Sequence, residues 1–230
     1  MTRTAPMVWG ALGANAWNPD QQKTATICVA VALAVYGDHT RDQGTPYIHH
    51  PVAVVAILRD ELGVTCPTGL MTGLLHDALE IDPGAAETIS SRLGDRFTAR
   101  LAAITPDHRL AGRPKQPGDK EAWHRKTEQM QPVSLTIRLA DRIHNLRDLA
   151  NSPDAGRRAR FVADLAEFHL PLAESRRGLD PHLAAAHALL LSEYDRYQQE
   201  ERCGEGRVLH GADRTDRREG LPPHGPQRDG

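Results

Sequence analysis

The helical pattern between residues 21 and 199 is the feature that most constrains the fold of this chain. Ala and Leu dominate this stretch, runs of β-branched residues are short, and neither alternating strand patterns nor Asn-Gly hairpin signals occur. Pro51 and Pro181 stand where a first helical turn tolerates a missing N–H, and Gly63 and Gly94 stand where helices stop. The sequence therefore predicts an all-α fold, built as a multi-helix bundle.

The pattern divides the chain into three parts. We expect a flexible N-terminal segment over residues 1–20, one domain over 21–199, and a disordered tail over 200–230, whose few large apolar residues cannot offset the entropy of ordering it. The polar stretch 107–119 is predicted to be a long loop. The predicted helices are Gln21–Tyr36, Pro51–Glu61, Thr68–Leu79, Ala85–Leu93, Arg96–Ile104, Val133–Leu149, Ala155–Glu174 and Pro181–Gln199.

Charge and cysteine content exclude several classes of protein. Lys and Arg number 28 against 30 Asp and Glu, a net charge of −2, so no overall electrostatic attraction to nucleic acid or an anionic membrane is expected. The three cysteines lie far apart, which argues against a disulfide framework or a thiolate zinc site. The longest apolar run, residues 27–36, is about half of what a bilayer requires. We expect a cytoplasmic protein that binds neither nucleic acid nor membrane.

The first chemical motif is the pair His76-Asp77, which stands inside an otherwise apolar predicted helix. A buried charged Asp needs a partner or a metal, because its bare desolvation costs several kcal/mol. Glu80 follows His76 by four residues and Asp77 by three, so all three side chains project toward one side of a helix. They can converge there on a cation and its bound water. The alternative is a purely structural, hydrogen-bonded His-Asp pair.

Two further segments add candidate ligands. One residue, His50, directly precedes a predicted helix start, from where its ring can point into a core cavity. Another, Asp141, lies on a helix with a regular apolar stripe, and Asn145 follows one turn later on the same side. Mixed imidazole and carboxylate donors suit Mn²⁺, Fe²⁺ or Zn²⁺. The candidate metal ligands are His50, His76, Asp77 and Asp141.

Three motifs together carry a resemblance to a known family. They are GTPYIHHP at 44–51, LLHDALE at 74–80 and LADRIHNLR at 139–147. In this order and spacing they resemble the HD phosphohydrolase domain of the RelA/SpoT-type alarmone hydrolases, especially the small stand-alone members. The similarity spans about residues 21–197.

The resemblance implies an all-α hydrolase that binds one Mn²⁺ and removes the 3′-pyrophosphate from guanosine tetra- or pentaphosphate. The family's metal ligands fall on the four candidates named above. Glu80 would orient or deprotonate the attacking water. The implied partner is a small nucleotide substrate.

One departure from the family pattern concerns the acidic pair after the HD motif. The family has Glu then Asp, whereas here Glu80 is followed by Ile81, which can neither accept a proton nor hydrogen-bond a water. Asp82 could replace the missing carboxylate if the helix ends there, as Pro83-Gly84 allows. Glu80 and Asp82 are therefore the candidate catalytic residues.

The resemblance also implies substrate contacts. It places Arg41 and Tyr47 near the nucleotide, Asn145 beside the metal, and Arg160 toward the distal phosphates, where a guanidinium can bind two oxygens at once. For Arg160, a solvated helix face in the basic run 157–160 is an equal alternative.

Three other functions are open at this point. The chain could be an HD phosphohydrolase of another phosphorylated nucleotide, which a substrate panel would separate. It could be a catalytically weakened nucleotide-binding regulatory module, which an Ile81→Asp variant would test. The third is a helical interaction protein with incidental motifs.

Overall fold

The computed structural model describes residues 4–212, and the side chains of residues 4–202. Within this part the chain is helical and has no strand; one isolated bridge pairs Thr40 with Pro46, and the all-α prediction is confirmed. No helix of the described residues is long and apolar enough to span a membrane. The helices are α1 (Thr4–Leu12), η1 (Ala14–Ala16), α2 (Pro19–Tyr36), α3 (His49–Ala56), η2 (Ile57–Glu61), α4 (Pro67–Leu74), α5 (Ala78–Ile81), α6 (Ala85–Leu93), α7 (Asp95–Ala103), α8 (Asp107–Leu110), α9 (Asp119–Glu128), α10 (Pro132–Asp148), η3 (Leu149–Asn151), α11 (Ala155–Asp164), η4 (Leu165–His169), α12 (Leu170–Arg176), η5 (Arg177–Leu179) and α13 (Pro181–Ala212).

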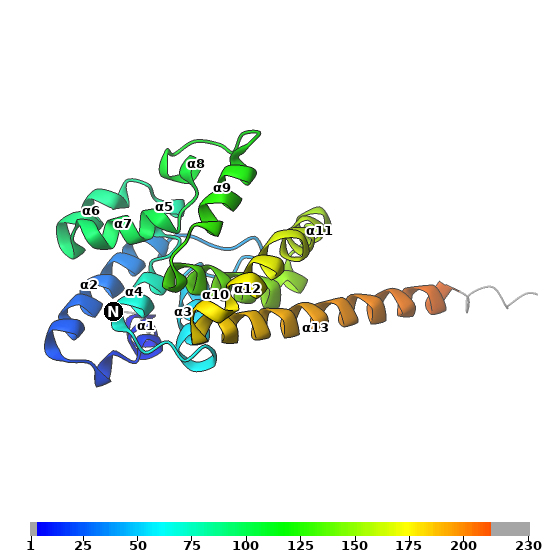
Figure 1. The fold of residues 1–230 in the computed structure, drawn as a ribbon, viewed down its shortest axis with the longest axis horizontal. Helices are drawn as coiled ribbons and strands as arrows, with labels where there is room; N and C mark the ends of the chain where they lie inside the picture. The colour runs from blue at the N-terminus through cyan, green and yellow to red at the C-terminus, as the bar shows by residue number, and fades with distance from the viewer. Residues whose placement is uncertain (1–3, 213–230) are drawn as a thin grey trace, which may run out of the picture. The chain divides into compact units, whose positions relative to one another are not determined.

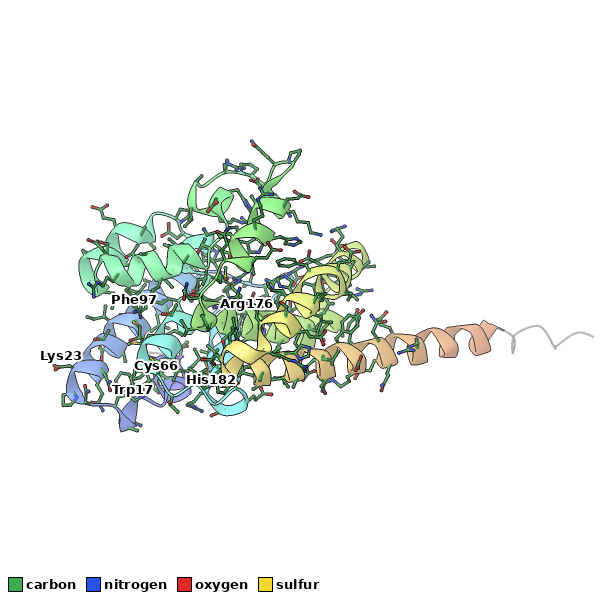
Figure 2. All side chains as sticks on the ribbon, in the orientation of Figure 1. Trp17, Lys23, Cys66, Phe97, Arg176 and His182 are labelled. Carbon is green, nitrogen blue, oxygen red and sulfur yellow. The ribbon has the colours of Figure 1, made fainter. Side chains whose placement is uncertain are left out.

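The chain divides into two units, residues 1–193 and 194–230. In the first unit α10 packs against α3, η2 and α4, and α2 packs against α1, α4 and α5 (Figure 1). Arg176, at the end of α12, donates to the carbonyl oxygens of Glu128 (2.7 Å) and Met130 (3.1 Å), which ties this helix to the end of α9 (Figure 2). The second unit contains the continuation of α13 to Ala212.

The helix that carries the HD motif is interrupted. A single helix was predicted over 68–79, but α4 ends at Leu74, a turn covers 75–77, and α5 begins at Ala78, so that prediction is wrong here. The His76 ring donates from Nδ1 to the carbonyl of Gly73 (2.8 Å), which is the group that the Asp77 N–H would use in a continuous helix. His76 and Asp77 therefore leave the helical register and turn together toward α10.

Close packing of α4 depends on Gly73. A Cβ at this position would overlap the Cδ1 atom of Leu58, which is fully buried in η2. We expect Gly73→Ala to lower the free energy of unfolding by about 1–3 kcal/mol, because Leu58 must leave its rotamer in a filled core.

The matched control for this substitution is Gly69→Ala in the same helix. A Cβ at Gly69 would meet Val64 at 3.5 Å and Val133 at 3.7 Å, which are ordinary contacts. Because Ala favours the helix over Gly, we expect no loss and a gain of up to about 1 kcal/mol. Urea unfolding of both variants checks the prediction, and equal destabilisation would contradict it.

The N-terminal region differs from the prediction. Residues 1–20 were expected to be flexible, yet Thr4–Leu12 forms α1, in which Val8 and Leu12 lie one turn apart and are fully buried. Arg59 donates to the carbonyl groups of Gly10 (2.8 Å) and Ala11 (2.5 Å) in the last turn of α1, which satisfies two of the groups at this helix end. One short apolar face and one distant Arg thus hold this segment as a helix, and neither gives a recognisable pattern in the sequence.

Two other predicted segments hold partial helices. The predicted loop 107–119 begins with the short helix α8, and only 111–118 is loop, closed by a bidentate ion pair from Arg113 to Asp119 (2.7 and 2.8 Å). The tail predicted over 200–230 continues α13 up to Ala212. Its remainder, 213–230, lies outside the described residues.

Candidate metal centre

Four buried side chains from three segments bring their donor atoms together. His50 comes from the first turn of α3, His76 and Asp77 from the turn between α4 and α5, and Asp141 from the middle of α10. One donor atom of each lies within 4.8 Å of all the others. The Nε2 atom of His50 is 3.2 Å from His76 Nε2, 3.2 Å from Asp141 Oδ1 and 3.3 Å from Asp77 Oδ2. The structure thus assembles the four predicted ligands.

This donor set fits a divalent cation. Donors at about 2.1 Å from a shared ion are about 3.0–3.4 Å from each other, and the donor pairs with a histidine are separated by 3.2 to 3.6 Å. Two carboxylates beside two imidazoles also create a strongly negative site. Although burial disfavours its charged form, the charge of Asp77 and the contact with Asp141 raise the pKa of His76 to about 10. The site therefore favours a positive charge.

The outer nitrogens of both histidines are satisfied, which leaves their Nε2 atoms facing the centre. His76 donates from Nδ1 to the Gly73 carbonyl, and the Nδ1 atoms of His50 and His144 lie 2.9 Å apart. Burial, with the positive charges of His50 and Arg41, lowers the pKa of His144 to about 4. His144 is therefore neutral near pH 7, and its Nδ1 can accept a hydrogen bond from the Nδ1–H of His50. Partners of this kind orient metal-binding rings.

We expect His144→Ala to weaken the affinity for a divalent ion by about 10–100-fold, because the His50 ring loses the partner that fixes its orientation. His144→Asn keeps an acceptor near the same place and is expected to recover most of the affinity. Titration of the metal-free protein with Mn²⁺, followed by calorimetry, measures both. Equal affinity for the wild type and the Ala variant would show that His144 does not orient the ligand.

A buried guanidinium missed by the sequence interpretation lies beside the donors. Arg138 Nη1 is 3.3 Å from Glu80 Oε1 and 3.7 Å from Asp77 Oδ1, and its Nη2 is 3.5 Å from Asp141 Oδ2. The available signal was an Arg three residues before Asp141 within an apolar helix. Arg138 compensates the negative charge of the site from its outer side.

The half-buried carboxyl group of Glu80 has an unusual acidity. Burial and the charge of Asp77 raise its pKa to about 7, although Arg138 opposes this shift. A carboxyl group with a pKa near the working pH can both accept and release a proton. The structure therefore places a suitable general base beside the candidate metal ligands.

Two of the predicted substrate residues contact the ligand set directly, and a third contacts it through one of these two. Tyr47 donates to Asp77 Oδ2 (2.7 Å), and Asn145 donates to Asp141 Oδ1 (2.6 Å). Arg41 in turn donates to Asn145 Oδ1 (2.8 Å). These residues thus also hold the ligand carboxylates in place.

Two cavities meet at this site. The metal cavity, of about 270 Å³, is lined by His50, Asp77 and Asp141 together with Arg41, Tyr47 and Asn145. The basic cavity, of about 500 Å³, is lined by seven Arg and Lys residues against three carboxylates. The linings share Glu80, Arg138, Arg142 and Arg157.

The basic cavity contains Arg160 and aromatic residues that the sequence interpretation did not single out. The Arg160 side chain is 75% exposed and lies 3.7 Å from Asp154. Trp123 lies under the guanidinium of Arg138 at 5.0 Å from the ring centroid, and Phe161 has the same relation to Arg142 at 5.3 Å. The cavity thus offers positive charge between apolar ring surfaces, which suits a phosphorylated compound with an aromatic base.

Asp82 is the one predicted site residue that belongs neither to the four-donor cluster nor to the lining of either cavity. It is exposed, its Oδ1 accepts from the Gly84 N–H (2.9 Å), and it lines neither cavity. The reason is that α5 ends at Ile81 and the chain then turns away into α6. Ile81 is also outside both linings.

An all-helical fold with a buried His/Asp centre defines a class of helical metal-site proteins, and the comparisons with known proteins give the family. The family model described as "HD domain" matches residues 28–179. The chain belongs to the HD domain family, as the motifs predicted.

Two relatives show what this chain is similar to. The bifunctional (p)ppGpp synthase/hydrolase SpoT of Escherichia coli K12 is 33% identical over 157 residues, covering 67% of this chain and 22% of the relative. Mouse guanosine-3′,5′-bis(diphosphate) 3′-pyrophosphohydrolase MESH1 is 29% identical over 157 residues, covering 66% of this chain and 82% of the relative. The chain thus matches about a fifth of the length of SpoT and most of MESH1.

A solved structure supports the fold. The protein reported as a metazoan ortholog of SpoT that hydrolyses ppGpp superimposes with a TM-score of 0.61 at 22% identity, over 78% of this chain and 95% of that chain. At this identity the likeness is one of fold.

Proposed function

We propose that this chain is a metal-dependent hydrolase that removes the 3′-pyrophosphate from guanosine 3′,5′-bis(diphosphate), ppGpp, giving GDP and pyrophosphate. The observation that carries the proposal is the four-donor cluster. Three of its residues line the metal cavity, which Glu80 also lines and which shares lining residues with the basic cavity. The names of the SpoT and MESH1 relatives agree with this substrate. We assign the activity to the predicted domain, 21–199.

The proposed chemistry divides between the ion and the protein. A bound divalent ion, for which we propose Mn²⁺, supplies a Lewis acid that polarises a phosphate oxygen and makes water more acidic. The four ligands would hold it. Glu80 accepts a proton from the attacking water and can release it to the leaving oxygen, because burial and the charge of Asp77 raise its pKa above that of an ordinary carboxyl group. The role proposed for Arg138 is to keep Glu80 in place and offset the carboxylate charge.

Substrate binding is assigned to both cavities. Arg41, Tyr47 and Asn145 face the nucleotide in the metal cavity, and Arg160 faces phosphates in the basic cavity. Trp123 offers an apolar surface to a base or ribose. Asp82 takes no part in the proposed reaction, since its carboxylate accepts a hydrogen bond from the backbone N–H of Gly84.

The test is release of pyrophosphate and GDP from ppGpp by the purified chain, with and without Mn²⁺. We expect turnover that requires the metal. Hydrolysis of a different phosphorylated nucleotide in preference to ppGpp, in a parallel panel, would keep the reaction and replace the substrate.

The second candidate, a weakened binding module, is favoured by Ile81. If hydrolysis is slow because one carboxylate is missing, Ile81→Asp raises turnover by roughly 10²-fold or more. We expect a smaller change, because residue 81 lines neither cavity. Comparison with Ile81→Asn separates the effect of a charge from that of polarity.

A further inference from the structure

Arg157 differs from the other Arg residues that line both cavities, because it forms no ion pair with the candidate metal ligands. The guanidinium groups of Arg138 and Arg142 are held by the metal-ligand carboxylates; Arg142 Nη2, for example, is 2.7 Å from Asp141 Oδ2. Arg157 comes from the first turn of α11, lines both cavities, and pairs with none of these carboxylates. It is thus a shared cation whose movement would leave the metal ligands undisturbed.

The partner of Arg157 is Asp42, which also lines the metal cavity. Arg157 Nη1 donates to Asp42 Oδ2, and the buried hydroxyl of Ser152 donates to the same oxygen at 2.7 Å. A tight turn carries Asp42, since the Arg41 N–H donates to the Thr45 carbonyl at 2.8 Å. The ion pair therefore joins this turn to α11 beside both cavities.

The ion pair between Arg157 and Asp42 can be replaced by a pair between Arg157 and a phosphate group. The Arg157 side chain is 48% exposed and that of Asp42 is 26% exposed, and ion pairs in contact with solvent contribute little to stability. A phosphate group offers more negative charge than one carboxylate and matches the planar fork of a guanidinium. A phosphate entering from either cavity can therefore replace Asp42 as the partner of Arg157.

Resting on the proposed function, we propose that Arg157 binds phosphate of the substrate where the two cavities meet, and that Asp42 competes for it as an internal anion. Asp42 holds Arg157 in place before binding and lowers the affinity for every anionic ligand. The pair thereby sets how strongly this chain discriminates phosphorylated from uncharged ligands.

The test uses Arg157→Gln, Asp42→Asn and the double variant in the metal-loaded full chain. The probes are GDP, which the proposed reaction does not consume, and guanosine, which lacks phosphate. Arg157→Gln is expected to weaken GDP binding by about 10–100-fold, as for loss of a hydrogen bond between charged groups. Asp42→Asn is expected to strengthen GDP binding a few-fold, because it removes the competing anion. Guanosine affinity stays unchanged, and calorimetry gives all values.

The matched control is Arg158→Gln. Arg158 is the next residue of α11, donates to the Ser152 carbonyl at 2.6 Å, and lines neither cavity. The substitution Arg158→Gln loosens the same segment without changing the charge of the cavities. We therefore expect GDP binding within about twofold of wild type.

Opposite shifts for Asp42→Asn and Arg157→Gln support the proposal. Weaker GDP binding by both, or parallel losses for guanosine, would overturn it in favour of a structural tie, as would unchanged GDP binding in Arg157→Gln. If the two variants shift GDP affinity in opposite directions but the wild type leaves ppGpp intact, only the proposed hydrolysis is rejected. A wild type that binds neither GDP nor ppGpp would reject both.

Discussion

The double variant His76→Ala/Asp77→Ala is expected to lose metal binding and hydrolysis together. It removes two of the four donors and leaves His50 and Asp141, which alone do not enclose an ion. We expect the rate to fall by more than about 10⁴-fold, beyond the contribution of one general acid–base group, because activation of water and screening of phosphate charge are both lost. Mn²⁺ titration and the ppGpp assay measure the two effects separately.

The control for this variant is His49→Ala. His49 adjoins His50 in sequence, but it is exposed and lines neither cavity, so its loss is expected to leave binding and rate near wild type. Urea unfolding of the double variant checks that the fold survives. Metal-dependent turnover in a folded double variant would place the reactive centre elsewhere.

The second large effect is expected for Glu80→Gln. The amide keeps the size of the side chain and a hydrogen bond to Arg138 but cannot accept a proton, so we expect the turnover number to fall by about 10²–10⁴-fold. Mn²⁺ affinity is expected to stay near wild type, because Glu80 is not among the four donors. Strong loss of metal binding would instead make Glu80 a ligand.

The pH dependence gives a further readout of the same variant. Glu80 acts as a base only when ionised, so the wild-type rate rises with pH through its pKa, about 7 in the metal-free protein and lower beside a bound cation. In Glu80→Gln this limb disappears. The raised pKa also affects the free energy of unfolding. Folding favours the neutral form of Glu80, and the stability that this form contributes is lost as the pH rises from 4.5 through about 7. We therefore expect Glu80→Gln to be no less stable than wild type at pH 8.

The sequence was sufficient to select the four side chains that cluster, but not to predict their local geometry. His50, His76, Asp77 and Asp141 stand in motifs whose residue types already limit the chemistry. The apolar residues on both sides of His76 and Asp77, however, predict one continuous helix and give no sign of the break. That break depends on one ring nitrogen bonding the Gly73 carbonyl, and hydrophobic periodicity does not register such a bond.

The cations around the site were harder to predict. Arg138 reaches Glu80 across 58 residues of sequence, and Arg157 reaches Asp42 across 115. In the sequence each is one Arg among many, and a charged run is usually a solvated helix face. Their roles come from the packing of α10 and α11 beside segments far away in the chain, so only the tertiary structure separates Arg157 from its neighbour Arg158.

Gly73 contributes to the core and to the metal centre at once. Its missing Cβ makes room for Leu58, and its carbonyl fixes the ring of His76. The packing of α4 and the orientation of a candidate ligand therefore depend on the same residue, so the folded core and the metal site form together. Loading with a divalent ion should raise the melting temperature, since a ligand that binds only the native state stabilises it. Heat resistance of the purified protein would then report its metal content, and a chelator added during purification would make the same sequence behave as a less thermostable protein.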